Sequence, residues 1–235
     1  MVQSKASGCD SPLPFGSNKN PEFRFLETPV KTLVFDLGNV VAWFSHEKAA
    51  RQLAQFGPKP DCETTIKALQ SHCFGSPLDH SFERGHIHRD HFRTQVKDPF
   101  GLKLADAEFD QAFSDIFKPN PATHEILDKI YSRPDRPRLW LLSNTTPLHI
   151  EHIQKKHPEW LRWFDRLALS YELGYRKPES GLYDQLCKDS GGDPSKLLLV
   201  DDLPANCEGA RACGWSAVCY QPNTDLLGEL AALGW

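Results

Sequence analysis

The sequence predicts an α/β fold: a Rossmann-like, mostly parallel sheet with helices on both faces, plus an inserted helical cap domain. After residue 121, short apolar runs alternate with segments of helical periodicity. Such alternation is typical of parallel strands joined by right-handed crossovers. Residues 46–118 differ, because their aromatic and leucine residues recur at helical spacing without a convincing strand pattern. The helical segment therefore interrupts the sheet domain.

The elements follow in order from these patterns. The run from Val30 to Val41 predicts a central strand, because it is apolar on both faces. Pro119 and Pro121 mark the return from the inserted segment. The alternation then predicts helices at 123–131, 147–156, 179–190, 205–213 and 225–233, and strands at 139–143, 167–170, 196–200 and 217–220. Pro178 suits the first turn of its helix.

We expect three segments along the chain. Residues 1–29 are rich in Ser, Pro, Gly and Asn and lack the apolar stretch of a signal peptide, which predicts a disordered N-terminal tail. Residues 30–45 and 119–235 would form the α/β catalytic core, and residues 46–118 the helical cap. A chain of 235 residues is long enough for one sizeable core and a smaller unit.

Composition limits the partners. Lys+Arg 27 against Asp+Glu 31 gives a net charge of -4, which does not attract nucleic acid or an anionic membrane. The apolar runs are far shorter than the roughly 20 residues of a membrane span. Seven scattered cysteines without a C-x-x-C pair are typical of a reduced protein. We expect a cytoplasmic monomer or homodimer with a small-molecule substrate, and neither nucleic acid nor membrane as partner.

Polar residues stand at the ends of three predicted strands and before one predicted helix. Each of them alone is typical of a turn, a helix cap or a solvated surface. In sheets of this type, however, ligands bind outside the carboxyl ends of the strands. Together they predict one site. The residues are Asp36, Ser143 with Asn144, Lys177, and Asp201 with Asp202.

This set suits phosphate chemistry. Clustered carboxylates repel one another, and a hard divalent cation such as Mg²⁺ would keep them ionised. Lys177 adds a positive charge, and the hydroxyl and amide groups of Ser143 and Asn144 suit phosphate oxygens. Such a site neutralises a phosphate and presents Asp36 to phosphorus, which supports covalent catalysis through an aspartyl-phosphate.

Four segments, VFDLGNVV, LLSNTT, GYRKPES and VDDLPANCEGA, resemble in order and spacing the motifs of the haloacid dehalogenase (HAD) superfamily of phosphatases. The DLGNV segment, the LSNT-x-x-LH stretch at 142–149 and the ERG segment at 83–85 resemble the alpha-D-glucose-1-phosphate phosphatase type. The resemblance extends from about Val30 to the C-terminus. It implies a Mg²⁺-dependent hydrolase of phosphate monoesters of small metabolites, with sugar phosphates such as glucose 1-phosphate among the candidates.

The resemblance also implies residue roles. Asp36 would be the nucleophile, and Lys177 would bridge it to the phosphate as a second catalytic and substrate-binding group. Ser143 and Asn144 would bind phosphate or substrate. The implied metal ligands are Asp36, the backbone carbonyl of Gly38, Asp201 and Asp202, of which Asp202 is expected to be more direct than Asp201.

Gly38 departs from the superfamily pattern, which usually has a second Asp at this position as general acid and base. A general acid contributes about 10²–10⁴ in rate. Either His46 or Glu83 of the cap supplies the acid, or the substrate has a good leaving group, as a sugar 1-phosphate does at its anomeric oxygen.

Two other functions stay open at this point. A haloacid dehalogenase-type hydrolase would use the same nucleophile on carbon without a metal, but it would not need the pair Asp201-Asp202. A catalytically inactive phospho-ligand-binding protein is favoured by Gly38 and disfavoured by the intact remainder of the site.

Overall fold

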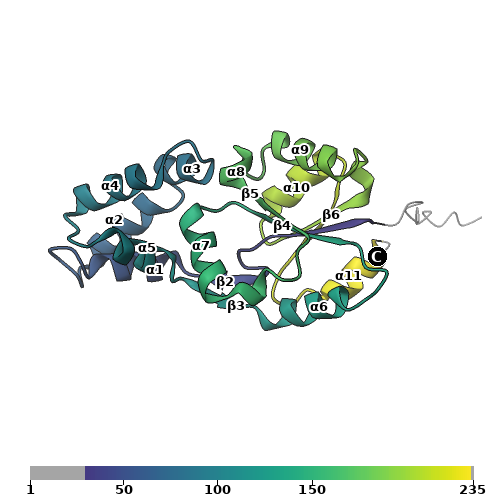
Figure 1. Cartoon of the computed structure of the whole chain (residues 1–235), viewed down its shortest axis with the longest axis horizontal. Coiled ribbons are helices and arrows are strands. Elements are labelled where there is room, and N and C mark those ends of the chain that lie inside the picture. The colour runs from purple at the N-terminus through teal and green to yellow at the C-terminus, as the bar shows by residue number, and fades with distance from the viewer. Residues whose placement is uncertain (1–29, 234–235) are drawn as a thin grey trace, which may run out of the picture.

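The computed structural model describes residues 30–233, so the predicted tail at 1–29 lies outside the described residues. At its centre is a five-stranded sheet in the order β5-β4-β1-β6-β7, seen nearly edge-on in Figure 1. The four strand pairings are all parallel, which confirms the predicted fold class. The strands are β1 (Thr32–Phe35), β4 (Arg138–Ser143), β5 (Arg166–Leu169), β6 (Leu197–Asp201) and β7 (Ser216–Cys219).

Helices cover both faces of this sheet (Figure 1). Leu33 and Phe35 face a cluster that includes Leu127 and Leu230, whereas Val34 faces a cluster with Leu182. Alternate residues of β1 thus reach two separate apolar layers, as expected of a central parallel strand. The helices are α6 (Pro121–Tyr131), α7 (Pro147–Lys156), α8 (Ser170–Leu173), α9 (Ser180–Ser190), α10 (Pro204–Ala212) and α11 (Leu226–Ala232), with 3₁₀ turns at Pro158–Trp160 and Pro194–Lys196.

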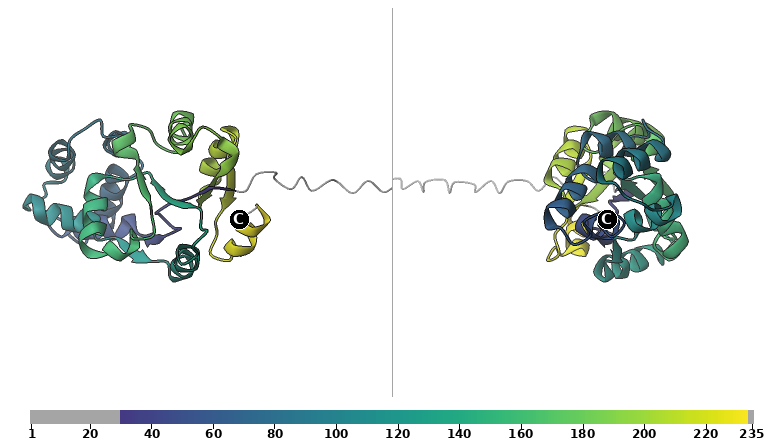
Figure 2. Two further views of the ribbon diagram at one scale, coloured as in Figure 1. Left: turned by 45° about the vertical axis from the view of Figure 1, so that its right-hand side comes forward. Right: turned by 90° about the vertical axis from the view of Figure 1, so that its left-hand side faces the viewer.

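The predicted helical insertion is also present, and it lies at the left of Figure 1 and toward the viewer in the right panel of Figure 2. Its helices are α1 (His46–Ala54), α2 (Glu63–Cys73), α3 (Pro77–Glu83), α4 (Arg89–Phe100) and α5 (Asp106–Ser114). They enclose their own apolar cluster, in which Phe92 and Phe113 are fully buried. Leu148 of α7 joins this cluster, so the insertion packs directly on the core.

The path between core and insertion differs from the prediction. Instead of one strand from Val30 to Val41, β1 ends at Phe35 and the chain turns through Asn39, whose φ is 55°. Two short strands then form an antiparallel ribbon, β2 (Ala42–Phe44) with β3 (Phe117–Pro119). The expectation of no strand within 46–118 was therefore wrong at its end. Strands of three residues are too short to show an alternating pattern in the sequence. They can be recognised only from their hydrogen-bonded pairing.

Two smaller features complete the framework. Helix α9 starts at Ser180 with Glu179 as its N-cap, so Pro178 stands before the helix rather than in its first turn. The Lys177-Pro178 peptide bond is cis. Within residues 30–233, no helix combines the length and the apolar character needed to cross a membrane.

Candidate active site

The strand order brings the polar residues together. Strands β4, β1 and β6 are neighbours in the sheet, and Phe35 is paired with both Leu141 and Val200. Because the strands are parallel, Asp36, Ser143 and Asp201 emerge at the same edge. Ser143 is buried, and its hydroxyl has only a long contact of 3.4 Å to the Asn144 carbonyl, which leaves that hydroxyl able to bind a ligand.

Three carboxylates gather at this edge. Asp36, Asp201 and Asp202 each offer an oxygen, and these oxygens lie within 4.8 Å of one another. Asp36 and Asp201 are buried and Asp202 is half-buried. Hard oxygen ligands at this spacing suit Mg²⁺. In the described part of the chain, no other group of His, Cys, Asp and Glu side chains meets this spacing.

Lys177 lies inside the same cluster. Its Nζ is 2.7 Å from Asp36 Oδ1 and 2.6 Å from Asp201 Oδ2, and it donates to the Leu142 carbonyl at 3.1 Å. Burial alone would lower the pKa of Lys177, but the two carboxylates outweigh it and raise the pKa, so the side chain is an ammonium. Its charge offsets one of three carboxylates. A divalent cation would offset the other two, and the donor set thus fits a metal ion.

The charges around Asp36 also fit a bound metal ion. Burial raises the pKa of Asp36 to about 7, against the opposing charge of Lys177 and with further upward pressure from Asp201. Asp36 Oδ1 accepts hydrogen bonds from the Leu37 amide at 2.7 Å and from Lys177, so Oδ2 is the oxygen available for other chemistry. A cation beside the carboxylates would favour ionised Asp36 and thereby a nucleophilic oxygen.

Asp201 and Asp202 have different surroundings. Asp201 Oδ1 accepts from Asn206 Nδ2 at 2.8 Å and from the Leu203 amide at 2.9 Å, while Oδ2 accepts from Lys177. Both Asp201 oxygens therefore accept from protein donors. Asp202 accepts one side-chain hydrogen bond, from Asn39 Nδ2 to Oδ2 at 2.9 Å. Asp202 thus has fewer protein donors than Asp201, and its role as the more direct ligand stays a prediction.

The side chain of Asn144 binds the backbone of Lys177, whereas the sequence predicted a contact with phosphate or substrate. Its Oδ1 accepts from the Lys177 backbone amide at 2.8 Å, and its Nδ2 donates to the Lys177 carbonyl at 3.0 Å. Both halves of the amide are used to fix the loop that carries Lys177 to the end of β4. Asn39 was not singled out from the sequence either, although Asn is among the few residues that adopt a left-handed turn readily.

Gly38 has a structural explanation. A Cβ atom at this position would lie 2.7 Å from Cε1 of Phe44, so the ring of Phe44 on β2 occupies the space that a side chain at 38 would need. An acid at this position is incompatible with Phe44 in its present place.

A hollow of about 60 Å³ lies between the insertion and this edge of the sheet. The hollow is lined by Leu37, Gly38, Phe44, His46, Phe74, Asp79, Glu83, Ile116, Phe117, Ser143, Asn144, Thr145 and His149.

The candidate acids differ in protonation. Burial lowers the pKa of His46 to about 4, so its imidazole is uncharged near neutral pH and a poor acid. Glu83 forms a 2.5 Å ion pair with Arg176, and burial raises its pKa. Burial also raises the pKa of Asp79 to about 7, with the charge of Glu83 adding to it. Asp79 was missed because its sequence context is that of an ordinary helix start.

Charged pairs join the insertion to the core around the hollow. Glu83 pairs with Arg176, and Arg84 pairs with Glu179 at the start of α9. Gly85 adopts a φ of 68°, and a Cβ there would lie 2.2 Å from the Tyr171 carbonyl oxygen, so the ERG segment packs closely on α8.

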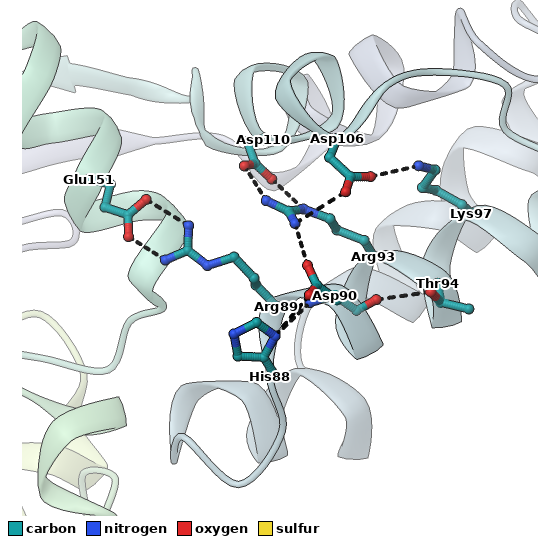
Figure 3. Close-up of polar contacts among 9 residues, drawn as sticks. All are labelled: His88, Arg89, Asp90, Arg93, Thr94, Lys97, Asp106, Asp110 and Glu151. Atoms are coloured by element: carbon teal, nitrogen blue, oxygen red, sulfur yellow. Dashed lines mark hydrogen bonds and ion pairs between the residues drawn. The ribbon is translucent and has the colours of Figure 1, made fainter.

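A separate network continues along α4 (Figure 3). Arg89 forms two hydrogen bonds with Glu151 of α7, and thereby links insertion and core. Arg93 lies within the insertion and binds Asp90, Asp106 and Asp110.

Comparison with known proteins agrees with this architecture. The chain is 29% identical over 209 residues to D-ribitol-5-phosphate phosphatase of Bacteroides thetaiotaomicron, covering 87% of this chain and 98% of the relative. It is 24% identical over 189 residues to a sesquiterpene phosphatase of Aspergillus oryzae, covering 80% and 88%.

A HAD family enzyme of B. thetaiotaomicron, solved in complex with magnesium and inorganic phosphate, has the same fold with a TM-score of 0.70. It is 24% identical, and the match covers 83% of this chain and 96% of that one. The family model for haloacid dehalogenase-like hydrolases matches residues 30–214. Since that span is most of the chain, the protein belongs to the haloacid dehalogenase-like hydrolase family.

Proposed function

We propose that the protein is a Mg²⁺-dependent phosphatase that hydrolyses phosphate monoesters of small metabolites through an aspartyl-phosphate intermediate. The observation that carries this proposal is the buried cluster in which Lys177 bridges Asp36 and Asp201 beside Asp202. Such a cluster has an excess of negative charge that a divalent cation and a phosphate can share. Both curated relatives described above are named phosphatases, which supports the same reaction.

Each residue then has a defined part. Asp36 Oδ2 attacks phosphorus, and the bond to the leaving oxygen breaks. Lys177 holds Asp36 in place and offsets the charge of the phosphate, while the Ser143 hydroxyl donates to a phosphate oxygen. Because the Asn144 side chain is engaged by Lys177, we assign its contact with phosphate to its backbone amide. Water then hydrolyses the aspartyl-phosphate.

The residues that would hold Mg²⁺ are Asp36, Asp202 and the backbone carbonyl of Gly38, with Asp201 supporting them. When bound, Mg²⁺ supplies positive charge that stabilises the phosphoryl group during transfer. The magnesium and phosphate bound to the structural relative support this assignment.

Two substrate types agree with different observations. The absence of an acid at Gly38 favours a sugar 1-phosphate such as glucose 1-phosphate, whose anomeric oxygen leaves readily. The relative that acts on D-ribitol 5-phosphate favours a plain alcohol as leaving group, and a plain alcohol needs an acid. Asp79, with its pKa raised to about 7, is the side chain in the hollow best suited to that task.

The test is a phosphate-release assay over a metabolite panel, with and without Mg²⁺, for the wild type and Asp36→Asn. We expect release that a chelator abolishes, and a loss of at least about a thousandfold in Asp36→Asn. Asp184→Asn, an exposed aspartate of α9, is the matched control and should keep full activity. Turnover that survives Asp36→Asn would remove the nucleophile from the proposal.

The same panel addresses the alternatives. Chloride release from 2-chloropropionate that does not depend on metal would favour a haloacid dehalogenase. Tight phosphate-ester binding without any turnover would favour an inactive binding protein. This alternative is retained because Phe44 occupies the space of a side chain at position 38, so that no acid stands there.

Three further assignments are part of the proposal. Residues 46–118 act as a cap that closes over substrate on the core of 30–45 and 119–235. The protein is a monomer or homodimer. It works in the cytoplasm, in support of which Cys62, Cys73, Cys187, Cys207, Cys213 and Cys219 are all free thiols.

A further inference from the structure

Four rings form a continuous stack beside the hollow. His46 stacks on Phe74 with 4.0 Å between ring centroids, Phe74 on Phe113 with 5.2 Å, and Phe113 on His149 with 4.7 Å. The interplanar angles are only 6°, 5° and 3°. Phe117 meets His149 edge-on at 5.4 Å. The imidazole of His149 is thus held in one orientation by rings of the insertion and of β3.

His149 is also close to the phosphate-binding loop along the chain. It lies in the first turn of α7, where its backbone amide donates to the hydroxyl of the N-cap Thr146. This turn follows directly on Ser143 and Asn144. The ring of His149 lines the same hollow as these two residues. A group attached to a phosphate at the sheet edge would therefore extend toward His149.

One atom of His149 has no hydrogen-bond partner. The residue is 8% exposed, and its Nε2 is buried without a partner among residues 30–233. The ring does have a backbone hydrogen bond with Phe113, so one nitrogen is engaged and the other is not. Buried polar atoms without partners are rare in folded proteins. A partner supplied by a ligand would explain this one.

The surroundings indicate what that partner is. Burial lowers the pKa of His149 to about 3, so the ring is uncharged near neutral pH. The hydrogen bond with the Phe113 backbone raises the pKa of His149 and is therefore donated by the ring, which leaves Nε2 as an acceptor. A hydroxyl group can donate to Nε2 without bringing a charge into this buried place, whereas a carboxylate has no proton to donate and an ammonium would lose its hydration. Asp79 and Glu83 line the same hollow and would accept from further hydroxyls. An alkyl chain would leave Nε2 of His149 unpaired.

We propose that His149 is a specificity-determining residue whose Nε2 hydrogen-bonds a hydroxyl of the substrate's alcohol part, so that phosphate esters of polyols and sugars are preferred to those of apolar alcohols. This inference rests on the proposed function, in that the hollow takes the alcohol part of a phosphate monoester. Sites built to hydrogen-bond a hydroxyl reject analogues that lack it far more strongly than apolar pockets reject extra groups.

The test uses two esters with five carbons each, D-ribitol 5-phosphate and pentyl phosphate, and the variant His149→Phe. The phenyl ring keeps the stack on Phe113 and removes both nitrogens. We expect kcat/KM of the wild type to favour the ribitol ester by at least about 100-fold. In His149→Phe the ribitol ester should lose about 10- to 100-fold, while the pentyl ester should stay within about threefold of the wild type.

Two further variants separate recognition from packing. His149→Gln places an amide near the position of Nε2 and should recover part of the preference for the ribitol ester. His152→Phe makes the same substitution on α7 at a residue that does not line the hollow, and should change neither ester. Thermal unfolding of each variant shows whether it is folded.

The outcomes are distinct. Equal losses for both esters in His149→Phe, or no loss for either, would overturn the inference. If His149→Phe does not fold, His149→Gln decides by whether the preference shifts. If the wild type releases no phosphate from any ester, the proposed function fails, and the inference is then judged by calorimetric binding of the two esters to the wild type and to His149→Phe. The same selective loss is expected there.

Discussion

Two regions face each other across the hollow. One is the sheet edge with Asp36, Lys177 and Asp201, and the other is the wall of the insertion with His46, Phe74 and Asp79. They differ in how their side chains are charged. At the edge, the charged groups of Asp36, Lys177 and Asp201 contact one another at 2.6–2.7 Å. The wall offers stacked rings and side chains that burial drives toward their uncharged forms, such as His46 and Asp79. The difference fits the proposals made above, in which the edge carries out the phosphate chemistry and the wall contacts the alcohol part of the substrate.

The largest effect is expected from removing the cation of the edge. Lys177→Met leaves Asp36 and Asp201 buried without their partner, which typically costs about 3–5 kcal/mol of stability. Loss of its charge should also lower phosphate release by about 10²–10³ or more. Denaturant unfolding and initial rates measure the two effects. Lys188→Met, an exposed lysine of α9, should change neither. Wild-type rates in Lys177→Met would show that the edge does not work as a unit.

The next largest effect is expected at Asp79 in the wall, where the stability of the protein should depend on pH. Because the pKa of Asp79 is raised to about 7 in the folded protein from an ordinary value of 3.8, its contribution to stability is full below pH 4 and is lost as pH rises through 7. Asp79→Asn should abolish this loss and make the protein more stable than the wild type at pH 8. Each pKa unit corresponds to about 1.4 kcal/mol, so the gain is on the order of a few kcal/mol.

Denaturant unfolding at pH 5 and pH 8 measures this difference. Asp98→Asn, at an exposed position of α4, should leave the pH dependence unchanged. If Asp79→Asn has the same pH dependence as the wild type, Asp79 is ionised in the folded protein and the contrast between wall and edge is weaker than described.

The smallest effect is expected at the surface ion pair that joins the insertion to the core. Glu151→Gln removes the charge that pairs with Arg89, and both side chains are partly exposed (Figure 3). Exposed ion pairs contribute about 0.2–1 kcal/mol, and the loss should shrink at high salt. Unfolding at low and high salt, with Glu208→Gln of α10 as control, measures it. A loss above about 2 kcal/mol would make this pair a main support of the closed insertion.

The sequence predicted correctly those features that depend only on which segments are buried and on their order along the chain. The parallel strands are apolar on both faces, and polar residues stand at or just after their ends, at Asp36, Ser143 and Asp201. Once the strands are parallel neighbours, these residues must meet. The interpretation failed for β2 and β3, whose hydrogen bonds join residues far apart in the chain. It also missed Asp79 and His149, because nothing in an ordinary helix turn indicates a buried carboxyl or an unpaired nitrogen.

The α/β architecture, the helical insertion and the residues at the sheet edge could all be predicted from the sequence, since periodicity and strand ends are local properties. The contacts that each group makes there became visible only in the folded structure. Asn144 holds the backbone of Lys177, Phe44 fills the space beside Gly38, and rings from the insertion orient His149. Hydrogen bonding, steric exclusion and desolvation depend on which atoms meet in space, and that is settled only when the insertion packs on the core.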